Sequence, residues 1–127
     1  MATNEVFNDA AWVSLPVTGA IKSGDPVRVG VLNGVAQTDA GVAGPPAVPG
    51  GVGNGTGFAS VALAGAFRVT VVGALTVGQL VYIKADQTLT ATASGNKVFG
   101  AALFAKAAGT GPAVVKIIQT GNDTAAA

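Results

Sequence analysis

The sequence has 127 residues, enough for one domain with its own core and too few for two. It contains no Cys and no His, which excludes disulfides, thiolate sites, and the usual zinc ligands and general bases. Seven basic and six acidic residues give a formal net charge of +1, and the basic residues are scattered, which argues against a nucleic-acid partner. So few charges suit a protein that is covered by partners in an assembly.

The first 12 residues show no strand alternation and are too short for an independent helix, so we predict an N-terminal arm over residues 1–12. The arm lacks the basic and apolar regions of a signal peptide, and the expected site of synthesis is the cytoplasm. Phe7 and Trp12 are two large aromatics outside the β pattern. They either fold back onto their own domain or anchor into a partner, as buried aromatics commonly do.

Enrichment in Val, Thr and Gly predicts an all-β fold. Residues 26–32 alternate, and Asn33-Gly34 predicts a hairpin turn before a return strand over 35–38. Further strands are predicted over 58–63, 67–71, 80–83, 89–92, 98–104 and 114–118. Residues 101–108 are Ala-rich, but the flanking Gly100 and Gly109 favour a strand and a turn over a helix. The aromatics of these strands are assigned to the core: Phe58, Phe67, Tyr82, Phe99 and Phe104.

Residues 41–57 form a long Gly/Pro-rich loop, which contains Pro45, Pro46 and Pro49 and cannot cross a membrane as a helix. Loops of this length are usually functional or disordered. We place a single β domain at residues 13–120 and a C-terminal tail at 121–127.

The sequence also contains an internal repeat. Residues 20–29 match residues 74–83 in spacing, because an apolar pair precedes a Gly turn and an alternating strand in each. Two similar β units that pack face to face predict a small barrel or sandwich.

We find no pattern that predicts chemistry. Lys22 and Ser23 are adjacent, so on a strand they point to opposite faces and cannot form a Ser–Lys dyad. Residues 51–55 lack the Lys-Ser/Thr of a phosphate loop. Four aspartates lie beside turn residues and are assigned to local turn hydrogen bonds: Asp25, Asp39, Asp86 and Asp123. We therefore predict no catalytic, cofactor or metal site, and a protein that is not an enzyme.

The order and spacing of several segments resemble the small capsid decoration, or cement, proteins of tailed bacteriophages over residues 13–119. The segments are Ile21-Lys22-Ser23-Gly24-Asp25-Pro26-Val27, residues 35–39, Leu75-Thr76-Val77-Gly78-Gln79-Leu80-Val81-Tyr82, residues 96–102 and Val114-Val115-Lys116-Ile117. The resemblance implies a β-barrel-like protein, usually trimeric, on the outside of an icosahedral head. There it would bind at three-fold or quasi-three-fold positions and clamp neighbouring major capsid subunits. The resemblance supplies no catalytic residues.

The expected function is therefore structural, on the outer capsid surface of the virion after synthesis in the host cytoplasm. The expected partners are the major capsid protein and further copies of the chain, with no nucleic acid and no membrane. The proline-rich loop is expected to be a trimer contact or an exposed tip. In the arm, the expected capsid contacts are Asn4, Glu5, Val6, Phe7 and Trp12.

Two alternatives come from other classes of protein. A carbohydrate-binding β module would need Trp12, Tyr82 and Phe58 on one open face. A β-clip-type accessory domain of an enzyme is suggested by the turn over residues 23–27.

Overall fold

The computed structural model describes residues 11–17, 21–41, 55–122 and 124–126, and these contain strands and no helix. The all-β prediction is confirmed, and residues 101–108 are strand and turn as predicted. The strands in chain order are β1 (Trp12–Pro16), β2 (Pro26–Val29), β3 (Leu32–Ala36), β4 (Phe58–Ala62), β5 (Ala66–Val72), β6 (Leu80–Ile83), β7 (Leu89–Thr90), β8 (Lys97–Ala102) and β9 (Thr110–Ile117).

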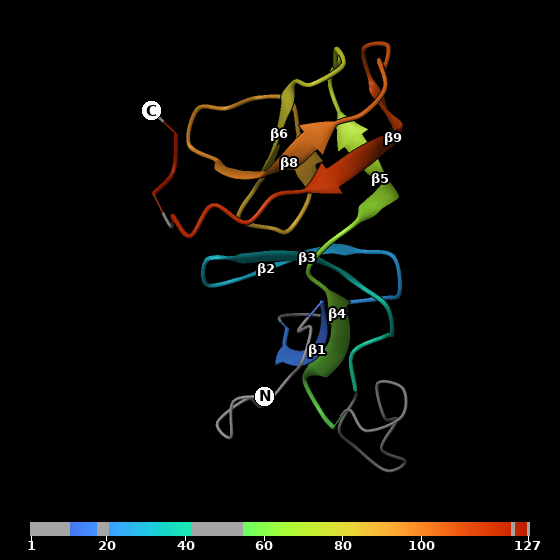
Figure 1. Cartoon of the computed structure of the whole chain (residues 1–127), viewed down its shortest axis with the longest axis vertical. Helices are drawn as coiled ribbons and strands as arrows, with labels where there is room; N and C mark the ends of the chain where they lie inside the picture. Colours follow the sequence, from blue (N-terminus) through green and yellow to red (C-terminus); the bar gives the residue numbers. More distant parts are fainter. Residues whose placement is uncertain (1–10, 18–20, 42–54, 123, 127) are drawn as a thin grey trace, which may run out of the picture.

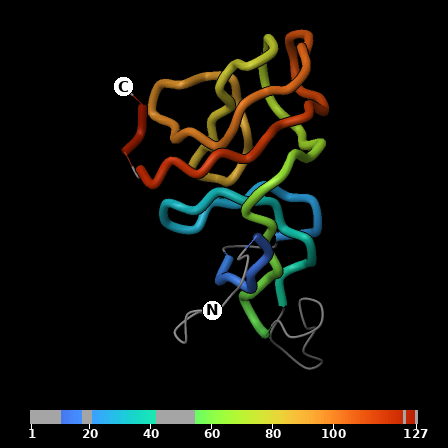
Figure 2. The backbone as a smooth tube through the Cα atoms, viewed as in Figure 1, coloured from blue at the N-terminus to red at the C-terminus, as the bar shows by residue number. Residues whose placement is uncertain are grey.

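The strands form two sheets that are stacked along the long axis of the molecule (Figure 1). The first sheet has the order β1-β4-β3-β2 and is antiparallel. The second is a closed ring in the order β5-β7-β6-β8-β9, in which the β5–β7 pair is parallel. The hairpin of β2 and β3, cyan in Figure 2, crosses between the remaining strands of the first sheet and the ring.

The internal repeat extends through both sheets. The order β1-β4-β3-β2 in the first sheet corresponds to β5-β9-β8-β6 in the second, and β7 is the additional strand that closes the ring. Among the described residues, β1 and β2 do not pair with each other, whereas β5 and β6 are joined through β7. Each four-stranded set is one copy of the same unit, which we call the first and the second unit.

Equivalent hydrogen bonds support this correspondence. The amide of Gly24 donates to the carbonyl of Ala36 at 2.7 Å, and the amide of Gly78 donates to the carbonyl of Ala102 at 2.8 Å. Similarly, Leu63 donates to Ala11 in the first unit, and Ile117 donates to Gly65 in the second. The two units therefore share equivalent backbone hydrogen bonds, although their sequences are only loosely similar.

The same correspondence explains a pair of glycines. A Cβ on Gly34 would fall against the Val61 side chain and 2.6 Å from the carbonyl oxygen of Ala62. A Cβ on the equivalent Gly100 would fall against the carbonyl oxygen of Lys116 and 2.9 Å from the Val115 side chain. Each glycine lets the hairpin strand approach the next strand of its sheet closely.

The predicted turn at Asn33-Gly34 is wrong. Val29 pairs with Leu32, so the hairpin turn lies at Gly30-Val31, where Gly30 has a φ of 61°. Asn33 and Gly34 lie inside β3 and are buried. The close approach at Gly34 and the buried hydrogen bonds of Asn33 outweigh the local preference of an Asn-Gly pair for a turn.

The core has two clusters. Inside the ring, the alternating residues of β5 and β9 pack around Phe99, which has no exposed surface. A smaller cluster in the first unit contains Ile21, Val27, Ala36, Ala40 and Val61. The assignment of all strand aromatics to the core is wrong for two residues, since Phe58 is 41% exposed and Phe104 is 64% exposed.

We predict that Gly34→Ala and Gly100→Ala each lower the free energy of unfolding by about 1–3 kcal/mol, because the added methyl overpacks a strand contact. Urea unfolding measures the change. Gly55→Ala is the matched control, since its Cβ would meet no atom within 4 Å, and its expected effect is below about 0.5 kcal/mol. An equal effect at Gly34 and Gly55 would contradict the close-approach explanation.

Candidate functional site

Of the predicted contact residues, the structure describes only Trp12. The remaining seven lie outside the described residues: Asn4, Glu5, Val6, Phe7, Pro45, Pro46 and Pro49. Trp12 begins β1, pairs with Ala62, and is 65% exposed. It therefore belongs to the first sheet rather than to a segment outside the β pattern, and most of its indole is available to a partner.

A buried polar junction holds the two sheets together. The Asn33 side-chain amide donates to the carbonyl oxygens of Val98 (2.9 Å) and Ile118 (2.8 Å), which belong to the second unit and the segment after it. Arg28 donates to the Asn33 side-chain oxygen at 2.6 Å, to Val98 at 3.2 Å and to the carbonyl of Asn122 at 2.7 Å. The junction fixes the first sheet against one side of the ring.

Gln119 completes the junction. Its side-chain oxygen accepts the backbone amide of Asn33 at 2.9 Å, and its side-chain nitrogen donates to the carbonyls of Asn33 and Leu63. The Gln87 side chain accepts the backbone amide of Arg28 at 2.6 Å, and Gln87 has a φ of 70°. Gln87 and Gln119 thus bind the backbone of the first unit, and the Asn33 and Arg28 side chains bind the backbone of the second at Val98.

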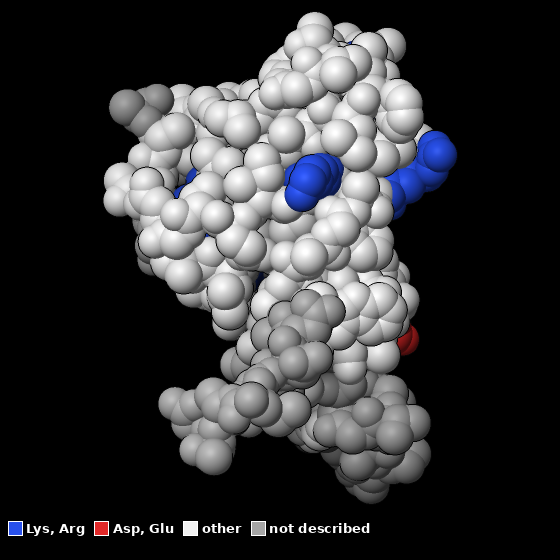
Figure 3. Space-filling model, viewed as in Figure 1, with Lys and Arg blue, Asp and Glu red and all other residues white. Residues whose placement is uncertain are grey.

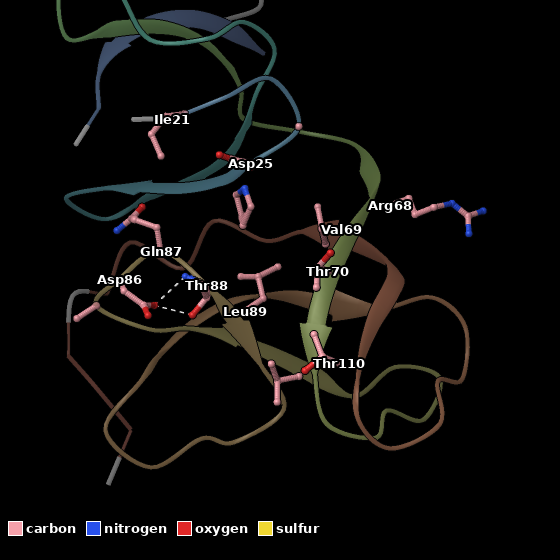
Figure 4. Close-up of a pocket in the computed structure, with 14 residues that line it drawn as sticks. Ile21, Asp25, Arg68, Val69, Thr70, Asp86, Gln87, Thr88, Leu89 and Thr110 are labelled. Atoms are coloured by element: carbon pink, nitrogen blue, oxygen red, sulfur yellow. Dashed lines mark hydrogen bonds between the residues drawn. The ribbon is translucent and has the colours of Figure 1, made fainter. Parts of the chain in front are cut away.

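A cavity of about 720 Å³ lies between the two units (Figure 4). The first unit contributes Ile21, Asp25 and Pro26, and the ring contributes residues of β5 and the segment 85–89. The Arg68 side chain extends away from the cavity in Figure 4, so its charge does not fill the cavity. The cavity offers apolar surface, threonine hydroxyls and two carboxylates.

Of these carboxylates, Asp86 has a shifted pKa. The hydroxyl and the backbone amide of Thr88 both donate to it, at 2.5 and 3.1 Å, and hold the pKa of this carboxyl below its usual range. Asp86 is fully exposed to solvent, so the shift reflects a local turn of the kind that the sequence predicts. It does not indicate an acid–base catalyst.

The polar side chains of the first unit are occupied with structural bonds. The Ser23 hydroxyl donates to the carbonyl of Gln37 at 3.0 Å, and Lys22 forms an ion pair with Asp39 at 3.6 Å. Ser23 is thus not paired with Lys22 as a nucleophile and base. In the part of the chain that the structure describes, no three metal-ligating side chains gather, and no helix is long and apolar enough to cross a membrane.

The comparison with protein families identifies the chain. The model of the phage cement protein family matches residues 8–117, which is most of the sequence, and the chain belongs to this family. Neither the curated proteins nor the solved structures give a significant match. The protein is therefore a structural, non-enzymatic component of the phage virion that is located on the capsid, and the resemblance inferred from the sequence is confirmed.

We predict that Asn33→Leu lowers the free energy of unfolding by about 1–3 kcal/mol, because two buried carbonyls and Arg28 lose a partner. Asn96→Leu is the control, since the Asn96 side chain makes one bond to Thr92 in an exposed position. Its expected effect is below about 1 kcal/mol. Chemical unfolding of both variants tests this, and an equal loss of stability in the two would show that the junction does not hold the sheets together.

Proposed function

We propose that the protein decorates the outer surface of an icosahedral phage head and stabilises the shell by clamping neighbouring major capsid subunits. Membership of the cement protein family over residues 8–117 is the observation that carries this proposal. The scarcity of charge supports it, because most of the described surface drawn in Figure 3 is white and the charged side chains on it are few and separate. When a partner covers a surface of this kind, the free-energy cost of desolvating charged groups is small.

Stabilisation of a shell does not require a strong individual contact. Each copy links subunits that are already held near one another, so a second contact forms at high effective concentration. A modest contact that is repeated over a closed lattice therefore sums to a large resistance against the pressure of the packaged DNA.

In this proposal, the N-terminal segment with Asn4, Glu5, Val6, Phe7 and Trp12 contacts the capsid. A segment that becomes ordered on binding loses conformational entropy, so its partner must bury enough apolar area to compensate. Burial of a large apolar side chain supplies about 1.5–3 kcal/mol. The exposed indole of Trp12 supports this role. Pro45, Pro46 and Pro49 form either a trimer contact or an exposed tip.

The carbohydrate-binding alternative receives less support from the structure. Trp12 and Phe58 lie on the paired strands β1 and β4 of the first sheet, and both are exposed. Tyr82 lies on β6 of the ring and is only partly exposed. A flat aromatic platform of the three residues is therefore not formed. The β-clip alternative depends on the turn over residues 23–27, which the repeat reproduces at residues 77–81 as part of the fold.

We predict that deletion of residues 2–11, or the double change Phe7→Ala and Trp12→Ala, weakens binding to undecorated capsids at least tenfold. Co-sedimentation with undecorated capsids measures the binding, and thermal melting of the free protein measures the fold. Val31→Ala is the control, because Val31 is an exposed apolar residue in the β2–β3 turn. A sharp fall in the melting temperature of the double variant would assign the two aromatics to the domain's own core. If neither the capsid binding nor the melting temperature of these variants changes, the arm is not part of the capsid interface.

We also predict that the copies on the capsid are clustered in threes at three-fold or quasi-three-fold positions, as heterologous contacts that close around a three-fold axis require. Electron cryomicroscopy of decorated heads counts the copies at each lattice position. The decisive count is on the capsid, since the free protein can be a monomer that assembles only on the shell. Isolated single copies on the lattice would contradict the trimer.

A further inference from the structure

A second exposed apolar surface lies at the end of the ring that points away from the first sheet. We call it the ring-end patch, and its location corresponds to the two loops at the top of Figure 1. The residues and their exposed fractions are Val77 70%, Leu80 40%, Leu103 39% and Phe104 64%.

Backbone bonds place these residues together. The segments 75–79 and 102–106 run antiparallel, because the amide of Lys106 donates to the carbonyl of Leu75 and the amide of Gly78 donates to the carbonyl of Ala102. This register puts Val77 across from Leu103 and Phe104. Leu80 follows on β6, where it pairs with Ala101. The four residues thus lie close together at this end of the ring and not at scattered positions.

The first unit provides an internal comparison for this surface. The positions equivalent to Val77, Leu103 and Phe104 hold Ser23, Gln37 and Thr38, which hydrogen-bond within their own unit. Lys22 and Asp39, which form the ion pair, correspond to Thr76 and Ala105. The same backbone is therefore compatible with a surface of polar side chains that hydrogen-bond within their own unit. Apolar residues at the ring end are not required by the fold.

The patch is also free of competing charge. Lys106 is the only charged residue within segments 75–79 and 102–109, and its ammonium donates to the carbonyls of Gly73, Ala107 and Gly109. These bonds hold the ammonium on the loop backbone and satisfy its donors. Most of the upper end of the molecule is white in Figure 3, in agreement with this arrangement.

We propose that the ring-end patch is a second capsid-binding surface that docks onto an apolar surface of the major capsid protein. The inference rests on the proposed function. From the exposed fractions, and about 150–250 Å² for a large side chain, the patch offers on the order of 400 Å². A stable pair of free proteins needs about 800 Å² on each partner, so the patch is too small to hold two copies together in solution. It is large enough for one of several contacts on a lattice.

The test replaces the patch by the residues of the protein's own first unit, in the triple variant Val77→Ser, Leu103→Gln and Phe104→Thr. We expect co-sedimentation with undecorated capsids to be at least tenfold weaker, with the melting temperature of the free protein unchanged. Val31→Ser is the control, because Val31 is 37% exposed in the β2–β3 turn of the first unit, and its binding is expected to be unchanged. If the triple variant fails to fold, Phe104→Lys serves in its place, since it alters one largely exposed side chain and should weaken binding equally.

The outcomes separate the two proposals. If the wild-type protein does not bind capsids, the proposed function and this inference both fail. If the wild-type protein and the patch variants bind equally well, only the inference fails. Light scattering of the free wild-type protein adds a third outcome, because a dimer that the triple variant abolishes would make the patch a contact between copies and overturn its assignment to the capsid.

Discussion

The structure depends on one buried polar junction between its two sheets. Asn33 lies inside β3 without exposed surface, and such a side chain is tolerated only when its hydrogen-bonding groups are satisfied. The carbonyls of Val98 and Ile118 and the guanidinium of Arg28 satisfy it, and the two carbonyls do so only when the ring is in one position. An apolar contact between the sheets would tolerate sliding, whereas this junction fixes a single arrangement. Every exposed surface of one unit therefore has a defined position relative to the other.

The two units show how one backbone acquires different roles. At equivalent positions inside the hairpin strand, the second unit has Phe99, the centre of the ring core, and the first unit has Asn33, the centre of the junction. The neighbouring Gly34 and Gly100 are the same because both sheets need the same close strand contact. Backbone geometry is shared between the units, and side-chain chemistry differs where the surroundings differ. The closing strand β7 belongs to the second unit alone, and Gln87 just before it contacts the first.

The sequence predicted the all-β fold and most strands because their alternation is a local property of the chain. It also indicated the repeat, since the turns around Gly24 and Gly78 need the same residue type in the same place. It misplaced the turn at Asn33-Gly34 because the preference of that pair is local, whereas the burial of Asn33 depends on Val98 and Ile118. It assigned Phe104 to the core for a similar reason. Strand spacing does not show where β8 ends, and Phe104 lies beyond its last residue, Ala102.

A comparison of the two units could have identified the ring-end patch from the sequence, once the equivalent positions were known. Val77 and Phe104 are unremarkable in a chain in which half of the residues are hydrophobic. They become informative because Ser23 and Thr38 occupy the same positions in a unit of the same fold. The first unit shows that the fold does not need apolar side chains there, so their presence requires another explanation. In a protein whose partners are arranged on a lattice, burial by a partner explains both the exposed aromatic side chain and the missing charges.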